Sequence, residues 1–147
     1  MSKFPLFLAL CVALVYYSAV ATENPRLEVL GLGEYAIYSR EDVKSSLVSR
    51  RVSSGIGYIY YTESVKAAAL REKFTIIDGE SIVCRFSAQQ VFKKLGYQEV
   101  SSGEGIHYGY SPRGLDFIKV SGQKINLQVA ERGGITIVGW PVILGSF

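Results

Sequence analysis

Residues that bind metals or form disulfides are scarce in this sequence. The 147 residues include only two cysteines and one histidine. Cys11 lies in an apolar N-terminal stretch, so Cys84 is the single cysteine in the remainder of the chain. This excludes an internal disulfide there, and a zinc or iron site would need a cluster of ligands that the sequence does not offer. We expect no metal and no cofactor, and a fold that is stabilised by apolar packing.

The chain also has little excess of one charge over the other. The formal net charge is +3, and like charges occur in runs no longer than pairs, such as Arg50-Arg51 and Lys93-Lys94. Proteins that bind nucleic acid or anionic membranes through charge carry a stronger basic excess. The sequence also offers no phosphate-binding loop and no nucleophile elbow. We therefore expect no nucleic-acid partner.

Residues 1–21, MSKFPLFLALCVALVYYSAVA, have the order of a secretory signal peptide. Lys3 gives a short basic start, an apolar run follows, and Ala19 and Ala21 stand at the −3 and −1 positions of a cut after Ala21. The alternative is an uncleaved membrane anchor, because the apolar stretch is close to the shortest length that spans a bilayer. In either case we expect residues 22–147 to form a single domain that is secreted or held in the cell envelope.

In the N-terminal half, local patterns predict strands that alternate with short helices. The sequence LEVLGLGEYAIYS (27–39) predicts one bent strand, or two short strands broken at Gly31 or Gly33. Ser39 is placed to cap a short helix, because Asp42 follows three residues later. The next segments are expected to be a surface loop (45–55), a strand (55–62) and a helix (63–74).

Two stronger signals follow. In FTIIDGESIVCRF (74–86), Asp78-Gly79 predicts a hairpin turn, and the alternative is a loop that leads into one strand. In that strand Ile82, Cys84 and Phe86 share a face, so Cys84 is expected to be a small buried residue. The sequence SAQQVFKKLG (87–96) predicts a helix with a capping box at its start and a glycine at its end.

The C-terminal half predicts strands alone. A hairpin is expected from YQEVSS (97–102) and GIHYGYS (105–111), followed by strands at 115–120, 124–131 and 134–143. In KINLQVA, alternation places Ile125, Leu127 and Val129 inward and Lys124, Asn126 and Gln128 outward. The predicted fold is α+β, with an antiparallel sheet that includes this C-terminal meander and one to three short helices packed on one face.

The stretch HYGYSPRG (107–114) holds the single histidine beside two tyrosines and an arginine. Alternation places Tyr108 and Tyr110 on one strand face and His107 on the other, which predicts that His107 points to the wetter side. Aromatic and arginine side chains are frequent contact groups for peptides and sugars. Tyr108, Tyr110, Arg113 and His107 are therefore the candidate binding residues, and a hydrolase that uses His107 as its base is the enzymatic alternative.

The sequence YSPRGLDFIKVSGQKINLQVAERGGITIVGWPVILGSF (110–147) resembles the C-terminal part of the YwmB-like secreted proteins of spore-forming Gram-positive bacteria. The shared features are a Tyr-Ser-Pro turn, a strand of the form I-N-L-Q-V-A and a Gly-X-Pro ending, and the resemblance extends back to about residue 80. It implies an exported α+β protein and brings no catalytic residue. This chain is shorter, its N-terminal half matches poorly, and Trp140 stands where a smaller residue is expected.

Together these patterns predict a small exported, non-enzymatic domain in the cell envelope or outside it. Its expected partner is a protein, a peptide or a glycan. The alternatives are the secreted hydrolase with His107 and a structural subunit tethered to the membrane by an uncleaved leader.

Overall fold

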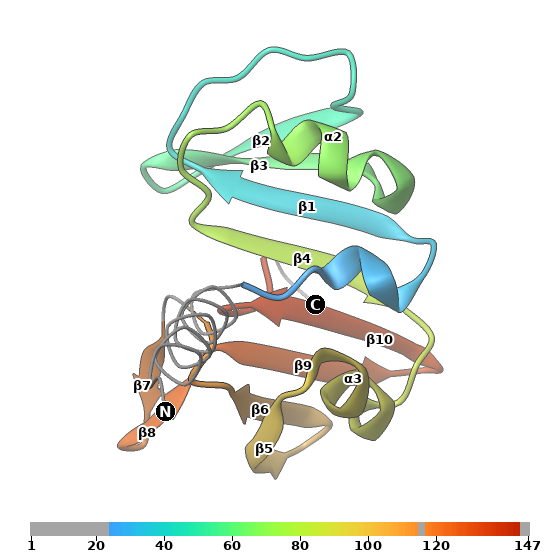
Figure 1. The fold of residues 1–147 in the computed structure, drawn as a ribbon, viewed down its shortest axis with the longest axis vertical. Helices are drawn as coiled ribbons and strands as arrows, with labels where there is room; N and C mark the ends of the chain where they lie inside the picture. Colours follow the sequence, from blue (N-terminus) through green and yellow to red (C-terminus); the bar gives the residue numbers. More distant parts are fainter. Residues whose placement is uncertain (1–23, 115–116, 145–147) are drawn as a thin grey trace, which may run out of the picture.

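The computed structural model describes residues 24–114 and 117–144. Within these residues, eight strands drawn from both halves of the sequence form one antiparallel sheet (Figure 1). Its order is β2-β3-β1-β4-β10-β9-β6-β5, so β4 and β10 join the N-terminal strands to the C-terminal ones. The strands are β1 (Glu34–Ser39), β2 (Arg50–Ser54), β3 (Gly57–Glu63), β4 (Gly79–Cys84), β5 (Gln98–Gly103), β6 (Ile106–Tyr110), β9 (Leu127–Arg132) and β10 (Ile135–Trp140). β7 (Ile118–Val120) and β8 (Gln123–Ile125) form a separate two-stranded sheet.

The helical segments lie on one side of the large sheet. They are the 3-10 helix η1 (Leu27–Leu30), the short helix α2 (Ala67–Arg71), which continues from η2 (Ser64–Lys66), and α3 (Ala88–Leu95). Figure 1 shows η1, α2 and α3 in front of the strands. The predicted combination of an antiparallel sheet with short helices is confirmed, although strands make up most of the fold.

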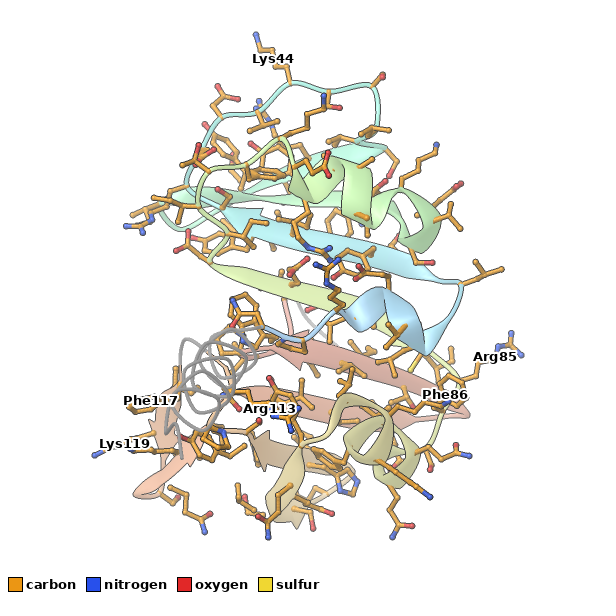
Figure 2. The ribbon with its side chains drawn as sticks, in the orientation of Figure 1. Lys44, Arg85, Phe86, Arg113, Phe117 and Lys119 are labelled. Atoms are coloured by element: carbon orange, nitrogen blue, oxygen red, sulfur yellow. The ribbon has the colours of Figure 1, made fainter. Side chains whose placement is uncertain are left out.

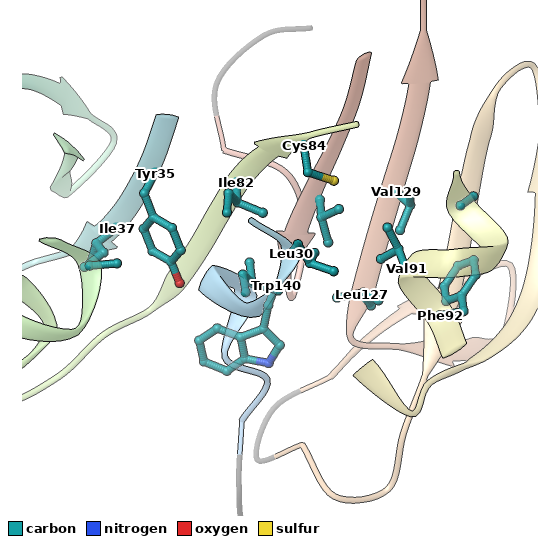
Figure 3. Close-up of a cluster of buried hydrophobic side chains, with 14 of the residues drawn as sticks. Leu30, Tyr35, Ile37, Ile82, Cys84, Val91, Phe92, Leu127, Val129 and Trp140 are labelled. Atoms are coloured by element: carbon teal, nitrogen blue, oxygen red, sulfur yellow. The ribbon is translucent and has the colours of Figure 1, made fainter. Parts of the chain in front are cut away.

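The core lies between these helices and the sheet. Side chains alternate along a strand, so Ile82 and Cys84 of β4 face the helices and are buried. Figure 3 shows them in one cluster with Trp140, the largest of the fully buried side chains. From α3, Val91 and Phe92 pack onto the same core, and Cys84 has the buried position that the sequence predicts.

The local signals at α3 are all confirmed. The Ser87 hydroxyl accepts a hydrogen bond from the Gln90 backbone N–H at 3.3 Å, and the Gln90 side chain accepts one from the Ser87 N–H at 2.9 Å. Gly96 ends the helix in the left-handed conformation, with φ of 73°. Strong local capping therefore fixes both ends of this helix without help from distant residues.

Two predictions between residues 27 and 49 are wrong. Residues 27–30 form a 3-10 turn instead of a strand, because this turn buries both Leu27 and Leu30 against the core. No helix follows Ser39, although its buried hydroxyl accepts from the Glu41 N–H at 3.1 Å; the same hydroxyl donates to the Ile76 carbonyl oxygen at 2.7 Å, which ties the start of the loop to a distant segment. The loop backbone is instead held by distant side chains, as where the Val43 N–H donates to the Tyr60 hydroxyl.

The predicted hairpin at Asp78-Gly79 is also wrong, and the alternative of a loop that leads into one strand is correct. The Asp78 N–H donates to the Tyr38 carbonyl oxygen, and its carboxylate pairs with Arg40, so the preceding segment crosses to β1 instead of folding back on β4. Part of the predicted surface loop, Arg50–Ser54, is the edge strand β2.

One predicted strand in the C-terminal half is interrupted. Ile125 belongs to β8, whereas β9 begins at Leu127, although Ile125, Leu127 and Val129 are all buried as expected. Asn126 between them is fully buried, not exposed as predicted. Its side-chain amide donates to the Ser111 carbonyl oxygen and accepts from the Ser111 N–H, which satisfies both groups away from water.

Candidate binding surface

The large sheet has one face without a helix among the described residues, and we call it the open face. Cross-strand pairing aligns one row of residues on it. In order, this row consists of Tyr108 (β6), Gln128 (β9), Gly139 (β10), Ser81 (β4), Ala36 (β1) and Tyr61 (β3). Adjacent strands lie about 4.8 Å apart, so the two tyrosines are separated by roughly 24 Å. Small side chains occupy the middle of the row and tyrosines stand at its ends.

The C-terminal segment 141–144 crosses the middle of this row. The Ile143 N–H donates to Gln128 Oε1 at 2.9 Å, and the Leu144 N–H donates to Ser81 Oγ at 2.8 Å. Gly139 lies directly beneath, and a Cβ atom there would be 2.3 Å from the Ile143 backbone. The absence of a side chain at Gly139 therefore lets the segment lie flat on the sheet.

A hollow of about 360 Å³ lies on the open face beside this segment. Its apolar lining comes from Ala36, Tyr61, Val83, Ile137, Ile143 and Leu144. Arg50 and Glu34 add opposite charges, with Arg50 Nη2 3.9 Å from Glu34 Oε1. The Arg50 guanidinium also lies 4.0 Å above the centre of the Tyr61 ring, a cation–π contact that holds both side chains over the sheet.

A second hollow of about 520 Å³ adjoins the first, because Glu34 lines both. Its lining includes Leu32 and Val65, whose exposed fractions are 82% and 66%. Val52 and Ile135 are exposed apolar residues on the open face itself. The second hollow lies at the end of the sheet, because Thr62 of the packed face and Val65 of η2 line it, so only the first hollow belongs to the open face. Exposed apolar side chains beside a hollow are typical of a contact surface.

The four candidate binding residues from the sequence do not form one cluster. Tyr108 and Tyr110 share a strand face, as their alternation predicts, but this is the open face and not the face toward the core, and both are half-buried. Arg113 lines a different hollow, between the chain before η1 and the end of α3. Tyr108 and Tyr110, which were predicted as binding residues, lie at one end of the open face. Arg50 and Tyr61 lie at the other end and were not predicted, because they are about 50 residues away in sequence.

His107 points to the side that the helices cover, so the prediction that it faces the wetter side is wrong. It pairs with the buried Val129, and its ring lies 6.5 Å from the Phe92 ring of α3. Alternation separated His107 from the tyrosines correctly, but it could not tell which of the two faces receives the helices. That choice depends on the packing of α3, which sequence alternation does not contain.

Both ring nitrogens of His107 face carboxylates. Nδ1 lies 2.8 Å from Glu99 Oε1, and Nε2 lies 3.2 Å from Glu131 Oε1. A β-bulge between Glu99 and Ser101 turns Glu99 to the face of His107. A general base needs a free ring nitrogen beside its nucleophile, and this arrangement offers none. Among the described residues, no group of three His, Cys, Asp or Glu side chains is arranged to hold a metal ion.

A buried polar cluster on the helix side was not predicted. The Tyr35 hydroxyl donates to Glu80 Oε1 at 2.8 Å, and Arg71 Nε donates to the same oxygen at 3.1 Å. Arg71 also binds both carboxylate oxygens of Glu28, at 3.0 and 2.7 Å. The cluster ties η1 and α2 to β1 and β4. The signal was present in the sequence, since alternation puts Glu80 on the buried face of Ile82 and Cys84.

The cluster changes the pKa values of its members in different directions. Burial raises the pKa of Glu80, although the charge of Arg71 acts against this. Burial also acts to raise the pKa of Glu28, but hydrogen bonds from Arg71 and the backbone, together with the charges of Arg71 and Arg26, outweigh it and lower that pKa. Burial raises the pKa of Tyr35, so its hydroxyl remains a donor. None of its four residues lines the hollows at the open face or beside Arg113, and its contacts hold the helices on the sheet.

Comparison with known proteins gives no family for this chain. No protein-family model matches it, and neither the curated proteins nor the solved structures contain a significant match. The resemblance to YwmB-like proteins stays a prediction.

Across residues 24–114 and 117–144, no helix has the length and apolar character needed to cross a membrane. The leader lies outside the described residues.

Proposed function

We propose that this chain is a small exported, non-enzymatic domain that binds a protein, peptide or glycan partner in the cell envelope or outside the cell. The open face is the proposed binding surface. The observation that carries the proposal is the row from Tyr108 to Tyr61, with a hollow of about 360 Å³ between Tyr61 and the C-terminal segment.

The chemistry of this face suits an extended partner. Tyrosine rings give a peptide or a sugar a flat apolar contact together with a hydroxyl for hydrogen bonding. Arg50 and Glu34 at the hollow offer a donor and an acceptor to the partner's polar groups. The C-terminal segment covers Ser81, so the room for a partner's backbone or sugar ring is the hollow beside that segment, between Ala36, Tyr61 and Ile143.

Export rests on the sequence of residues 1–21, with its basic start, apolar run and Ala-Val-Ala ending. The enzymatic alternative has less support, because the carboxylates of Glu99 and Glu131 occupy the neighbourhood of both His107 nitrogens. The tethered alternative turns on whether the leader is cut. N-terminal sequencing of the exported protein decides this, with Thr22 as the expected first residue.

The test is partner recovery from envelope extract with paired variants of the full chain. Arg50→Ala/Tyr61→Ala and Tyr108→Ala/Tyr110→Ala should each reduce recovery at least about tenfold, because aromatic and arginine contacts dominate most interfaces. A panel of peptides and glycans, measured in parallel, identifies the class of partner.

The matched control is Phe117→Ala/Lys119→Ala, which also removes one exposed aromatic ring and one cation, at the small β7–β8 sheet (Figure 2). This control should bind as the unmodified chain does. The proposal fails if both open-face variants are folded and retain full recovery, or if the control loses as much as they do.

A further inference from the structure

A separate hollow of about 210 Å³ lies on the helix side, between the chain before η1 and the end of α3. Three segments that are distant in sequence contribute one cation each, namely Arg26, Lys94 and Arg113. Asn24, Tyr97 and Ser111 add polar groups, and none of the residues that line the hollow is Asp or Glu. The lining is therefore rich in donors and contains no carboxylate, although Arg26 also interacts with Glu28 nearby.

The three cations differ in what they offer. The Lys94 ammonium lies 4.6 Å from the centre of the Phe86 ring, before the start of α3, so its charge is directed away from Arg113 (Figure 2). Arg26 lines the hollow, and its charge also interacts with the Glu28 carboxylate. Arg113 is exposed, and no carboxylate of the described residues forms an ion pair with it, so its guanidinium is the group available to a ligand.

Two hydroxyl groups complete the lining. The Tyr97 hydroxyl is buried and has no hydrogen-bond partner among the described residues, although a buried donor without a partner destabilises a fold. Burial raises the pKa of Tyr97, so the group stays protonated and able to donate. The Ser111 oxygen accepts from the Arg113 N–H at 3.3 Å, which leaves its own proton for a ligand.

The position of Ser111 is fixed from below. Its backbone N–H and carbonyl oxygen both bond to the Asn126 side chain, at 3.0 and 2.8 Å, and the residue is buried. This clasp holds the turn that carries Arg113 against the rest of the hollow. The donors are therefore preorganised, which lowers the entropic cost of binding.

We propose that this hollow binds a small oxyanion of the phosphate type through Arg113, Tyr97 and Ser111. Guanidinium and hydroxyl donors match the geometry and charge of phosphate oxygens, and such an oxygen would satisfy the buried Tyr97 hydroxyl. The hollow has room for a phosphate group and a small substituent. The site lies on the helix side, so it does not depend on the function proposed for the open face.

The first experiment titrates the full chain with inorganic phosphate at low ionic strength, using calorimetry and amide chemical shifts. The unmodified chain should bind, with shifts at Tyr97, Ser111 and Arg113. Arg113→Gln should weaken binding at least about tenfold, because it removes a charge-assisted hydrogen bond. Tyr97→Phe should weaken it about threefold or more without lowering Tm, since it removes a donor that has no partner in the free protein.

The matched control is Lys44→Gln, which removes one positive charge from the loop at the opposite end of the molecule (Figure 2). Its affinity for phosphate should stay within about twofold of the unmodified chain. The proposal is overturned if the unmodified chain does not bind phosphate. It is overturned equally if Arg113→Gln and Lys44→Gln weaken binding to the same degree, because binding would then follow net charge alone.

A vesicle arm separates a free phosphate from a lipid headgroup. Phosphatidylcholine vesicles are compared with vesicles that also contain phosphatidic acid, whose headgroup is a phosphomonoester. The hollow binds a headgroup if the unmodified chain and Lys44→Gln bind the vesicles with phosphatidic acid and Arg113→Gln does not. Phosphate binding without vesicle binding assigns it to a free anion. Vesicle binding that both variants weaken equally would contradict a site at Arg113.

Discussion

Glu80 lies on the packed face of β4, beside Trp140 on β10, with only 3% of its surface exposed. A buried carboxylate is costly unless it is paired and hydrogen-bonded, and Tyr35 and Arg71 supply both partners. Glu28 extends the cluster to η1 through Arg71. In the centre of the molecule, the fold is therefore held partly by polar contacts, where the sequence alone would predict apolar packing.

Glu28 and Glu80 should change the pH dependence of stability in opposite directions. The pKa of Glu28 is lowered in the fold, so its contribution is present above its unfolded-state pKa and is lost as the pH falls through the folded value. The pKa of Glu80 is raised, so its contribution is present at low pH and is lost as the pH rises through the folded value. Between roughly pH 3 and 6, Glu28→Gln should flatten the rise of the unfolding free energy and Glu80→Gln should steepen it. Urea titrations across this range measure both slopes, and changes of the same sign would contradict this account.

Single residues also mark the limit of prediction from sequence. Alternation gave the relative faces of His107, Tyr108 and Tyr110, but it left open which face the helices cover. It failed at Asn126, which is polar and yet fully buried, because its partner Ser111 is brought there by the fold. Long-range pairing of this kind leaves no trace in local periodicity.

At the scale of elements, α3 is specified locally and the segments around β1 are not. Capping residues and an apolar stripe predicted α3 from Ser87 to Gly96, and the structure places it there. Residues 40–49 have a similar capping pattern at Ser39, yet contacts with Tyr60 and Ile76 hold them in a loop. Asp78-Gly79 likewise does not form the predicted hairpin turn, because the segment bonds to β1 instead.

Ser87→Ala should destabilise the protein by about 1 kcal/mol, because the Gln90 N–H loses its capping oxygen. The free energy of unfolding in urea measures this loss. Ser46→Ala, in an exposed loop, serves as the control and should change stability by less than about 0.5 kcal/mol. Equal effects of the two substitutions would show that the capping box contributes nothing.

Gly139→Ala should lift the C-terminal segment from the open face. The new methyl group would lie 2.3 Å from the Ile143 backbone, and the contact can be relieved only by moving the segment or the strand. We expect a loss of roughly 1–3 kcal/mol in stability and faster amide exchange at Ile143 and Leu144. Gly103→Ala meets no atom within 4 Å and is the control. Unchanged exchange at Ile143 and Leu144 in a folded Gly139→Ala variant would rule out this packing.

At the scale of the whole molecule, one sheet unites both halves of the chain. β4 and β10 pair along five residues of each strand, and the apolar core draws on both halves. The sequence predicted an antiparallel sheet for the C-terminal half and strands without a sheet order for the N-terminal half. Strand order depends on contacts between distant segments, so it was not predictable from local patterns.

This continuity predicts a single cooperative unfolding transition. Far-UV circular dichroism reports on the whole sheet, while fluorescence of Trp140 reports on its junction at β4 and β10, and the two urea curves should coincide. Reducing agent should leave the midpoint unchanged, because Cys84 is a free buried thiol. Two separated transitions would show that the halves fold independently.

The claim that the open face receives the partner is tested most directly by hydroxyl-radical footprinting of the recovered complex. We predict that Tyr61 and Tyr108 react in the free protein and become protected in the complex, while Phe117 on the small sheet reacts equally in both. Protection confined to η1 and α3, with Tyr61 and Tyr108 unchanged, would contradict the account.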